Sequence, residues 1–509
     1  MTQPEATNTA PASQATIRFR GGKALSALPI VFFILWAIFQ SGLLGISDTG
    51  GLIAGMLVGL ILGMLFVRGD WKDYANTVFE GMAQPVAVTA IVAWLWAGMF
   101  SATLQVGAFV DGLGWLADAA SVGPALFPAI SFVLAALLAT GIGTGYGTVI
   151  AFVALFFPAG VALGADPVLM FGAILSGAVF GDNLAPVSDT TIVSAVTQDA
   201  DVGGVVASRF KYALTAAALA LILYIFAGSM ASGTNIAPET AAAFREQTNP
   251  AGLLHLISMG IVVFAAIAGR HIIEAISWGL IAAIIINLAF GLSAGTEILV
   301  FRVAEDSWAG GAFGGWPLVE AVAASEVGVG GSIYSGAVGF VQLAVLILLV
   351  IAGAQIMIRG GAFQAMQDWL LNTLARTVRS AEMVMVTVTA AINAAITINT
   401  AAEIAVAPYI STIGKRFNIN GYRRANILDA NTSALGYIFP WAGGVLVGYT
   451  EMVKLVDSYE WFTPEMVVAP TQAWPWVFHG WLLVAVFVFS AWTGFGREYT
   501  IDRLTKPNQ

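Results

Sequence analysis

Polar side chains suited to holding a small cation interrupt an apolar stretch at residues 176–195, which reads SGAVFGDNLAPVSDTTIVSA. The interrupting groups are two carboxylates, one amide and three hydroxyls: Asp182, Asp189, Asn183, Ser188, Thr190 and Thr191. Their oxygens are hard ligands of the kind small cations prefer. Burying a carboxylate in apolar surroundings is costly, so such residues mark functional sites. We expect a Na⁺ ion to bind at Asp182, Ser188, Asp189 and Thr190.

A second set of oxygen-bearing residues lies in LDANTSALGYIFPW (428–441) and AITINTAAE (395–403). Its candidate ion ligands are Asp429, Asn431, Thr432, Ser433, Asn399, Thr400 and Glu403. Either Glu403 or Asp429 can instead pair with Arg423 or Arg424, which would make its role structural.

Three further residues are candidates for contact with a solute. Thr144 and Thr148 belong to the glycine-rich TGIGTGYGT (140–148), and Trp441 ends the second polar stretch. A lone threonine in an apolar helix usually bonds its own backbone, which is the alternative interpretation of Thr144 and Thr148. Trp441 has packing as its alternative.

Helix breaks account for the placement of these polar groups. Pro186 prevents a helix from continuing, and Gly177 and Gly181 allow the chain to turn. Backbone groups freed at a break cannot face hydrocarbon, so protein or a hydrated cavity must cover them. The ends of the half-helices then supply partial charges and free carbonyls. We therefore predict that the two polar breaks face each other and share a cation.

Composition predicts an all-α polytopic membrane protein. The 509 residues are 58% hydrophobic and 10% charged, whereas soluble domains carry about 25% charged residues. The charge-free runs exceed the ~20 residues of a spanning helix and lack the alternation of a β-barrel. Cysteine is absent, which excludes disulfides and thiol chemistry, and three scattered histidines make a histidine metal site improbable.

Apolar segments predict about fourteen crossings. They are 28–46, 50–67, 85–104, 122–139, 148–164, 168–200, 210–232, 253–269, 273–292, 337–357, 381–396, 400–413, 424–449 and 476–495. Residues 71–84 and 360–380 read as amphipathic surface helices. With both termini cytoplasmic, all of the 21 lysines and arginines except Arg245, Arg302 and Lys454 fall inside, as the positive-inside rule requires. We expect a multi-pass protein of the cell inner membrane.

The chain also repeats itself. GLIAGMLVGL (51–60) and GLIAAIIINL (279–288) open corresponding crossings, and each half then carries two polar breaks in the same order. Corresponding crossings are seven apart, so the halves would have opposite orientations, an architecture of secondary transporters. The predicted organisation is a tail (1–27), a first inverted repeat (28–232), a connecting loop (233–252), a second inverted repeat (253–495) and a tail (496–509).

GAILSGAVFGDNLAPVSDTTIVSA (172–195) resembles the signature of NhaC-type sodium/proton antiporters, within the ion transporter superfamily. GTGYGT and IFPW (438–441) are also similar. The resemblance implies a scaffold domain that forms a homodimer interface and a transport domain that carries the discontinuous helices in an elevator-like movement. Some members of this family exchange organic anions coupled to sodium and protons.

Sodium-coupled secondary transport is the function these features predict, with Na⁺/H⁺ antiport by alternating access as its form. Its partners are Na⁺, H⁺ and lipid, with no nucleic acid, and Na⁺ is the coupling ion with no other cofactor. The alternative is Na⁺-coupled transport of a carboxylate, amino acid or zwitterion. A channel would not need the inverted repeat. An enzyme is disfavoured because an HExxH motif is absent, and ATP-driven transport is disfavoured because a GxxxxGK[ST] motif is absent.

Overall fold

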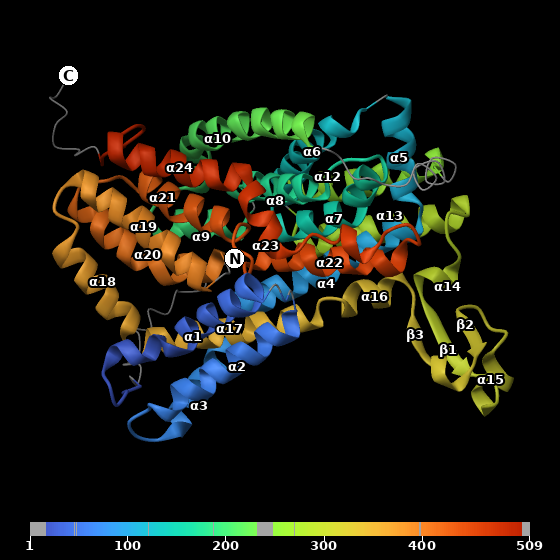
Figure 1. Cartoon of the computed structure of the whole chain (residues 1–509), viewed down its shortest axis with the longest axis horizontal. Coiled ribbons are helices and arrows are strands. Elements are labelled where there is room, and N and C mark those ends of the chain that lie inside the picture. Colours follow the sequence, from blue (N-terminus) through green and yellow to red (C-terminus); the bar gives the residue numbers. More distant parts are fainter. Residues whose placement is uncertain are drawn as a thin grey trace, which may run out of the picture.

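The computed structural model describes residues 17–44, 46, 48–120, 122–186, 188–231, 248–268, 270–396 and 399–500. Its helices form one elongated bundle, from which a small strand-bearing unit projects (Figure 1). The helices of the first half are α1 (Leu28–Ala37), α2 (Thr49–Leu65), α3 (Trp71–Met82), α4 (Pro85–Val106), α5 (Phe109–Ala119), α6 (Phe127–Ile142), α7 (Gly145–Ala162), α8 (Pro167–Leu184), α9 (Asp189–Thr197) and α10 (Val202–Met230).

The second half adds further helices and three short strands. The helices are α12 (His255–Ile267), α13 (Ile272–Phe290), α14 (Gly295–Ile298), α15 (Trp308–Phe313), α16 (Ser332–Val338), α17 (Val341–Arg359), α18 (Ala362–Thr373), α19 (Val378–Ile396), α20 (Asn399–Arg416), α21 (Gly421–Leu435), α22 (Gly443–Ser458), α23 (Pro470–Ala473) and α24 (Phe478–Thr493). The strands are β1 (Val300–Ala304), β2 (Val319–Val322) and β3 (Gly328–Gly330).

Long apolar helices confirm the prediction of a polytopic helical membrane protein. Within the described ranges, eight helices are long and apolar enough to cross a membrane. Large apolar side chains on these helices and on the shorter apolar helices are exposed, among them Leu35, Ile61, Phe226 and Phe264. In a bilayer these side chains would contact lipid rather than water.

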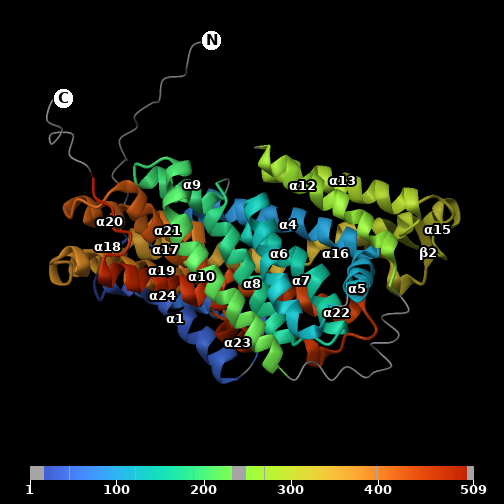
Figure 2. The same ribbon diagram turned by 90° about the horizontal axis from the view of Figure 1, so that it is seen from above.

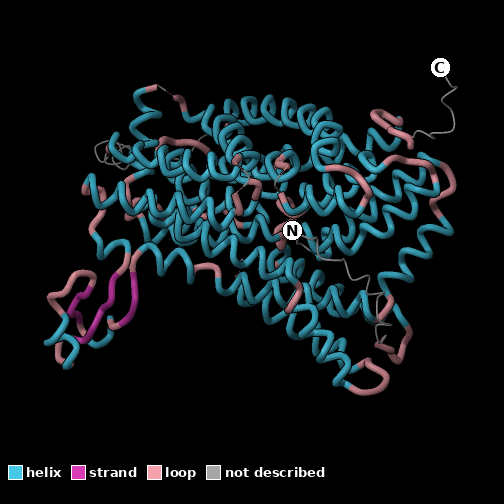
Figure 3. Tube along the Cα trace, turned by 180° about the vertical axis from the view of Figure 1, so that it is seen from behind, coloured by secondary structure: helices cyan, strands magenta, loops and turns pink. Residues whose placement is uncertain are grey.

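The strands form a small sheet that the sequence analysis did not predict. Their order is β2–β1–β3, with β1 parallel to β2 and antiparallel to β3. Figure 3 shows this unit at one corner of the molecule, away from the helical bundle. It lies in the segment between α13 and α16, which the predicted topology places outside the cell.

Three groups of packed helices build the bundle. The first contains α1, α2, α3 and α17, and the second joins α4 to α13 and α16. In Figure 2, α12 and α13 lie side by side along one edge of the molecule. The third and largest group packs α6 to α10 against α19, α20, α21 and α24, and it contains the candidate site. The predicted surface helices correspond to α3 and α18.

Both predicted interruptions are present as helix breaks. One separates α8 from α9 between Leu184 and Asp189, and the other separates α21 from α22 between Leu435 and Gly443. At the first break, Asp182, Asn183, Ser188 and Thr190 are buried, so the surrounding protein covers the polar groups there. This satisfies the requirement that freed polar groups be shielded from lipid.

Two helical hairpins end against these breaks. Asn399, the first residue of α20, hydrogen-bonds to Asp182, and Gly145, the first residue of α7, packs on the Tyr437 hydroxyl. The arms of these hairpins correspond to four segments that were predicted to be full crossings: 122–139 with 148–164, and 381–396 with 400–413. Because their tips meet helix breaks inside the bundle, we describe α6–α7 and α19–α20 as hairpins that end within the protein.

Close packing of α6 on α8 depends on two glycines four residues apart. A Cβ atom on Gly177 would lie 2.5 Å from the Ala135 Cβ, and one on Gly181 would lie 2.1 Å from the Ala139 Cβ. Small residues at this spacing allow membrane helices to approach closely. The contact fixes the end of α8, and with it Asp182, against the tip of the first hairpin.

Candidate functional site

Asp182 lies at the point where both helix breaks and the second hairpin tip meet. Its side chain is buried near the end of α8. Its Oδ1 atom accepts a hydrogen bond from Ser188 Oγ at 2.8 Å, and its Oδ2 atom accepts bonds from Asn399 Nδ2 at 3.3 Å and Tyr437 Oη at 3.2 Å. These three neutral donors come from three different parts of the chain, so tertiary packing assembles the site.

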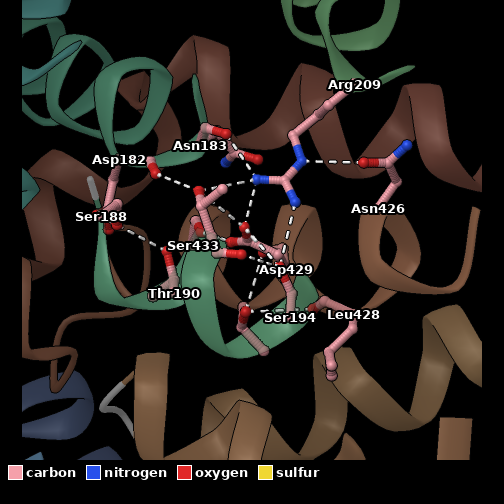
Figure 4. Close-up of polar contacts among 12 residues, drawn as sticks. Asp182, Asn183, Ser188, Thr190, Ser194, Arg209, Asn426, Leu428, Asp429 and Ser433 are labelled. Atoms are coloured by element: carbon pink, nitrogen blue, oxygen red, sulfur yellow. Dashed lines mark hydrogen bonds and ion pairs between the residues drawn. The ribbon is translucent and has the colours of Figure 1, made fainter. Parts of the chain in front are cut away.

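Neighbouring oxygens extend this cluster around Asp182. Thr190 Oγ1 lies 3.0 Å from Ser188 Oγ, and Figure 4 shows Asp182, Ser188 and Thr190 together on one side of the site. Asn393 Nδ2 donates to Asn399 Oδ1 at 3.3 Å. The Oδ1 atoms of Asn393 and Asn183 are buried without a hydrogen-bond partner in the described part of the chain. Such amide oxygens are suitable additional ligands for a cation.

The four predicted Na⁺ ligands are therefore placed as follows. Asp182, Ser188 and Thr190 converge on one cluster. Asp189 is the first residue of α9, but its side chain lies outside the described residues. Its role as a ligand stays a prediction.

Asp429 forms a buried ion pair with Arg209. Arg209 Nη1 donates to Asp429 Oδ2, and both side chains are fully buried. The alternative partners considered from the sequence, Arg423 and Arg424, bind elsewhere. Arg423 pairs with Glu382 at 2.8 Å, and Arg424 donates to the Gln198 carbonyl at 2.7 Å. Arg209, Arg423 and Arg424 are buried within α10 and α21 rather than exposed. The prediction that they lie on the cytoplasmic side of the membrane stays a prediction.

Hydroxyl groups complete the surroundings of Asp429. Ser433 donates to its Oδ1 atom, and Thr191 and Ser194 donate to its Oδ2 atom at 3.3 and 3.4 Å. Thr191 also reaches the Asp182 carbonyl oxygen at 3.5 Å, so it stands between the two aspartates. The predicted residues Asp429, Ser433 and Thr191 are thus close to the first break, as expected from facing breaks.

The remaining candidates in the second half line the same region. Glu403 is buried and accepts a hydrogen bond from Thr432 Oγ1 at 2.7 Å. Glu403 lies four residues after Asn399 on α20, so both project from one face of that helix. Asn431 donates to the Ile427 carbonyl at 2.9 Å, while its Oδ1 atom has no hydrogen-bond partner among the described residues. Thr400 is buried beside Asn399.

The three candidate solute contacts form hydrogen bonds with the protein backbone. Thr144 caps α7 through Gly147, and Thr148 donates to the Thr144 carbonyl at 2.9 Å. Trp441 donates to the Ala394 carbonyl at 2.8 Å and stacks on Phe439. These bonds tie the first hairpin tip and the second break in place, which is the structural alternative given above for these residues.

Arg209 and Tyr437 are the important residues that sequence reasoning missed. Arg209 stands near the start of α10, where a basic residue usually marks the cytoplasmic end of a span. Tyr437 lies inside the polar stretch 428–441, but its hydroxyl did not distinguish it from a packing aromatic. In the structure α10 begins at Val202, well before the expected 210, so Arg209 lies within a helix.

Comparisons with known proteins found a matching family profile and several partial relatives. A sequence profile of the Na⁺/H⁺ antiporter family matches residues 4–229 and 231–481. The malate-2H⁺/Na⁺-lactate antiporter of Bacillus subtilis is 30% identical over 36% of this chain and 37% of its own length. The Na⁺/H⁺ antiporter NhaC of Alkalihalophilus pseudofirmus is 24% identical over 28% of this chain and 29% of its length.

The arginine/ornithine antiporter ArcD of Halobacterium salinarum is 28% identical over 41% of this chain and 42% of its length. The chain thus aligns with less than half of each of these three relatives. Among solved structures, Neisseria gonorrhoeae MtrF, described as one of a class of antimetabolite efflux pumps, has a TM-score of 0.39 to this chain. The match has 10% sequence identity and covers 91% of this chain and 94% of that one.

Proposed function

Because this chain belongs to the Na⁺/H⁺ antiporter family, we propose that it is a secondary transporter that exchanges Na⁺ for H⁺ at Asp182. A buried carboxylate held by neutral donors from both helix breaks and a hairpin tip is the observation that supports this proposal. Na⁺ and H⁺ compete for the same carboxylate, so binding one releases the other. Exchange then needs no second ion site.

The donors around Asp182 can serve either occupant. When the carboxylate is not protonated, Ser188 and Tyr437 hydroxyls can turn their lone pairs toward a bound Na⁺. Amide oxygens of Asn399 and Asn393 supply further neutral ligands. Asp189 and Thr190 complete the proposed Na⁺ site, while Thr432 and Glu403 lie farther along α20 and α21.

Alternating exposure requires that the site move relative to another part of the protein. In the proposal, the helices that carry the breaks form the transport domain, and α1, α2, α3 and α17 belong to the scaffold. An elevator-like displacement of one against the other would expose Asp182 to each side in turn. The scaffold would also form a homodimer, with both termini on the cytoplasmic side of the cell inner membrane.

Transport in proteoliposomes tests this proposal. With an imposed pH gradient and no organic solute present, external Na⁺ should dissipate the gradient, and the rate should saturate with Na⁺. Asp182→Asn should abolish this activity while leaving a monodisperse, folded protein. Asp166→Asn is the matched control, because Asp166 caps the opposite end of the same helix through Leu169. Full Na⁺-dependent activity in the Asp182→Asn variant would contradict the assignment.

Na⁺-coupled movement of an organic solute is the second candidate function. It is favoured by two similar proteins, a malate-2H⁺/Na⁺-lactate antiporter and an arginine/ornithine antiporter. In that case Asp182 would hold the coupling ion, and Thr144, Thr148 and Trp441 would lie beside the solute. Failure of Na⁺ alone to dissipate the gradient, with recovery after adding a carboxylate or amino acid, would favour this function.

A further inference from the structure

Arg209 is surrounded by oxygen atoms of the kind that bind a free cation. Its guanidinium donates to Asn426 Oδ1 at 3.1 Å, the Asn183 carbonyl at 2.6 Å, Thr191 Oγ1 at 3.3 Å, Ser194 Oγ at 3.4 Å and the Asp429 carboxylate. One carboxylate, one backbone carbonyl, one amide and two hydroxyls therefore surround it. Figure 4 shows the guanidinium between Asn183 and Asp429, on the opposite side from Asp182 and Ser188.

The charge in this cage is fixed. Arg209 carries a positive charge on its side chain, and this charge balances the carboxylate of Asp429. Asp182, by contrast, accepts from the neutral donors Ser188, Asn399 and Tyr437. Thr191 Oγ1 lies between the Asp182 carbonyl oxygen and the Asp429 carboxylate, and Arg209 pairs with that carboxylate.

We infer that Arg209 acts as a tethered cation that fills a second cation cage, built from Asn183, Thr191, Ser194, Asn426 and Asp429. This inference rests on the proposed function, in which Asp182 exchanges mobile ions. Arg209 is thereby a specificity-determining residue. Removing its side chain opens a second site for a small inorganic cation or for free guanidinium.

Thermal stability of the purified full-length protein tests the cage directly. Arg209→Ala should melt at a lower temperature than wild type in choline chloride. At equal ionic strength, NaCl or a low concentration of guanidinium chloride should raise its melting temperature by about 3 °C more than they raise that of wild type. Arg209→Lys keeps a tethered charge and should show only the wild-type increment. Arg209→Ala/Asp429→Asn lacks the carboxylate and should lose the additional increment.

Two results would overturn the inference. The first is an increment in Arg209→Ala no larger than that of wild type. The second is an equal increment in the double variant, because the cage carboxylate would then be irrelevant. Where Arg209→Ala does not fold in choline, the inference requires that guanidinium or Na⁺ restore a monodisperse protein, and failure in every salt would also overturn it.

The thermal-stability test of the Arg209 cage can succeed or fail independently of the transport test of the proposed function. Placed in an Asp182→Asn background, Arg209→Ala should keep its additional increment, because Asp182 makes no part of the cage. A wild-type protein that fails to exchange Na⁺ for H⁺ would leave this increment unaffected. Transport at Asp182 and cation binding in place of Arg209 are therefore measured independently.

Discussion

Replacing Ser188 with alanine should weaken Na⁺ binding without stopping transport. Ser188 is fully buried, and its Oγ atom lies 2.8 Å from Asp182 Oδ1 and 3.0 Å from Thr190 Oγ1. A hydrogen bond to a charged group contributes about 1.5–3 kcal/mol. Because Asn399 and Tyr437 still bind the Asp182 carboxylate, we take the lower end of that range.

The free energy converts directly into an affinity. Each 1.4 kcal/mol changes an equilibrium constant tenfold, so loss of the Ser188 oxygen should raise the KM for Na⁺ by about tenfold. The maximal rate should change little, since Asp182 still carries the ion. The assay is the Na⁺-driven dissipation of a pH gradient in proteoliposomes over a range of Na⁺ concentrations, with protein monodispersity checked beforehand.

Ser258→Ala is the matched control. Ser258 is also fully buried in a helix, α12, but in the described part of the molecule its Oγ atom has no hydrogen-bond partner. Both variants remove one buried oxygen, so a general packing effect would appear in both. A KM for Na⁺ in Ser188→Ala that matches the Ser258→Ala value would refute the reasoning about the Asp182 site.

Three more predictions concern packing and charge. Gly436→Ala should stop transport and destabilise the protein by about 1–3 kcal/mol, because the added Cβ atom would lie 1.8 Å from Asn399 Oδ1. Gly260→Ala has open space around it, so it should change neither thermal unfolding nor transport. Glu382→Gln should destabilise by about 3 kcal/mol in thermal unfolding, because the buried carboxylate is the shared partner of two arginines. The pKa of Glu498 is shifted by burial, which raises it, and more strongly by hydrogen bonds and a nearby lysine that lower it below its ordinary value. Its ionised form therefore stabilises the folded C-terminal segment above the ordinary carboxyl pKa, and this stabilisation disappears as the pH falls through the lowered pKa. Amide hydrogen exchange of residues 494–500 should be faster in Glu498→Gln than in wild type at pH 7 and equal in both below that lowered pKa.

The polar breaks could be predicted because membranes penalise them so strongly. Pro186 and the carboxylate of Asp182 are unfavourable in a lipid-facing helix, so their presence in an apolar stretch indicated a covered break. The structure places the second break beside the first, as expected, through the bond from Tyr437 to Asp182. Element type and break position followed from local composition alone.

Contacts across the bundle could not be predicted in the same way. A basic residue near the end of an apolar segment satisfies the positive-inside rule whether it is exposed or buried, so the sequence does not predict that Arg209 is buried. Only the packing of α10 against α8, α9 and α21 reveals its partners. The small sheet was missed for another reason: its strands have only three to five residues, and the segments between them contain the short helix α15 and a 3₁₀ turn at Ala324–Glu326.

The two aspartates differ in the cost of losing the partners that bind their carboxylates. Asp429 shares a buried ion pair, and removing one partner of such a pair costs about 3–5 kcal/mol because an uncompensated charge is left behind. Asp182 is held instead by a serine, an asparagine and a tyrosine, whose hydrogen bonds can be exchanged for bonds to an arriving ion. In the proposed exchange, an arriving ion would replace these hydrogen bonds of Asp182, whereas Asp429 would keep its bond to Arg209.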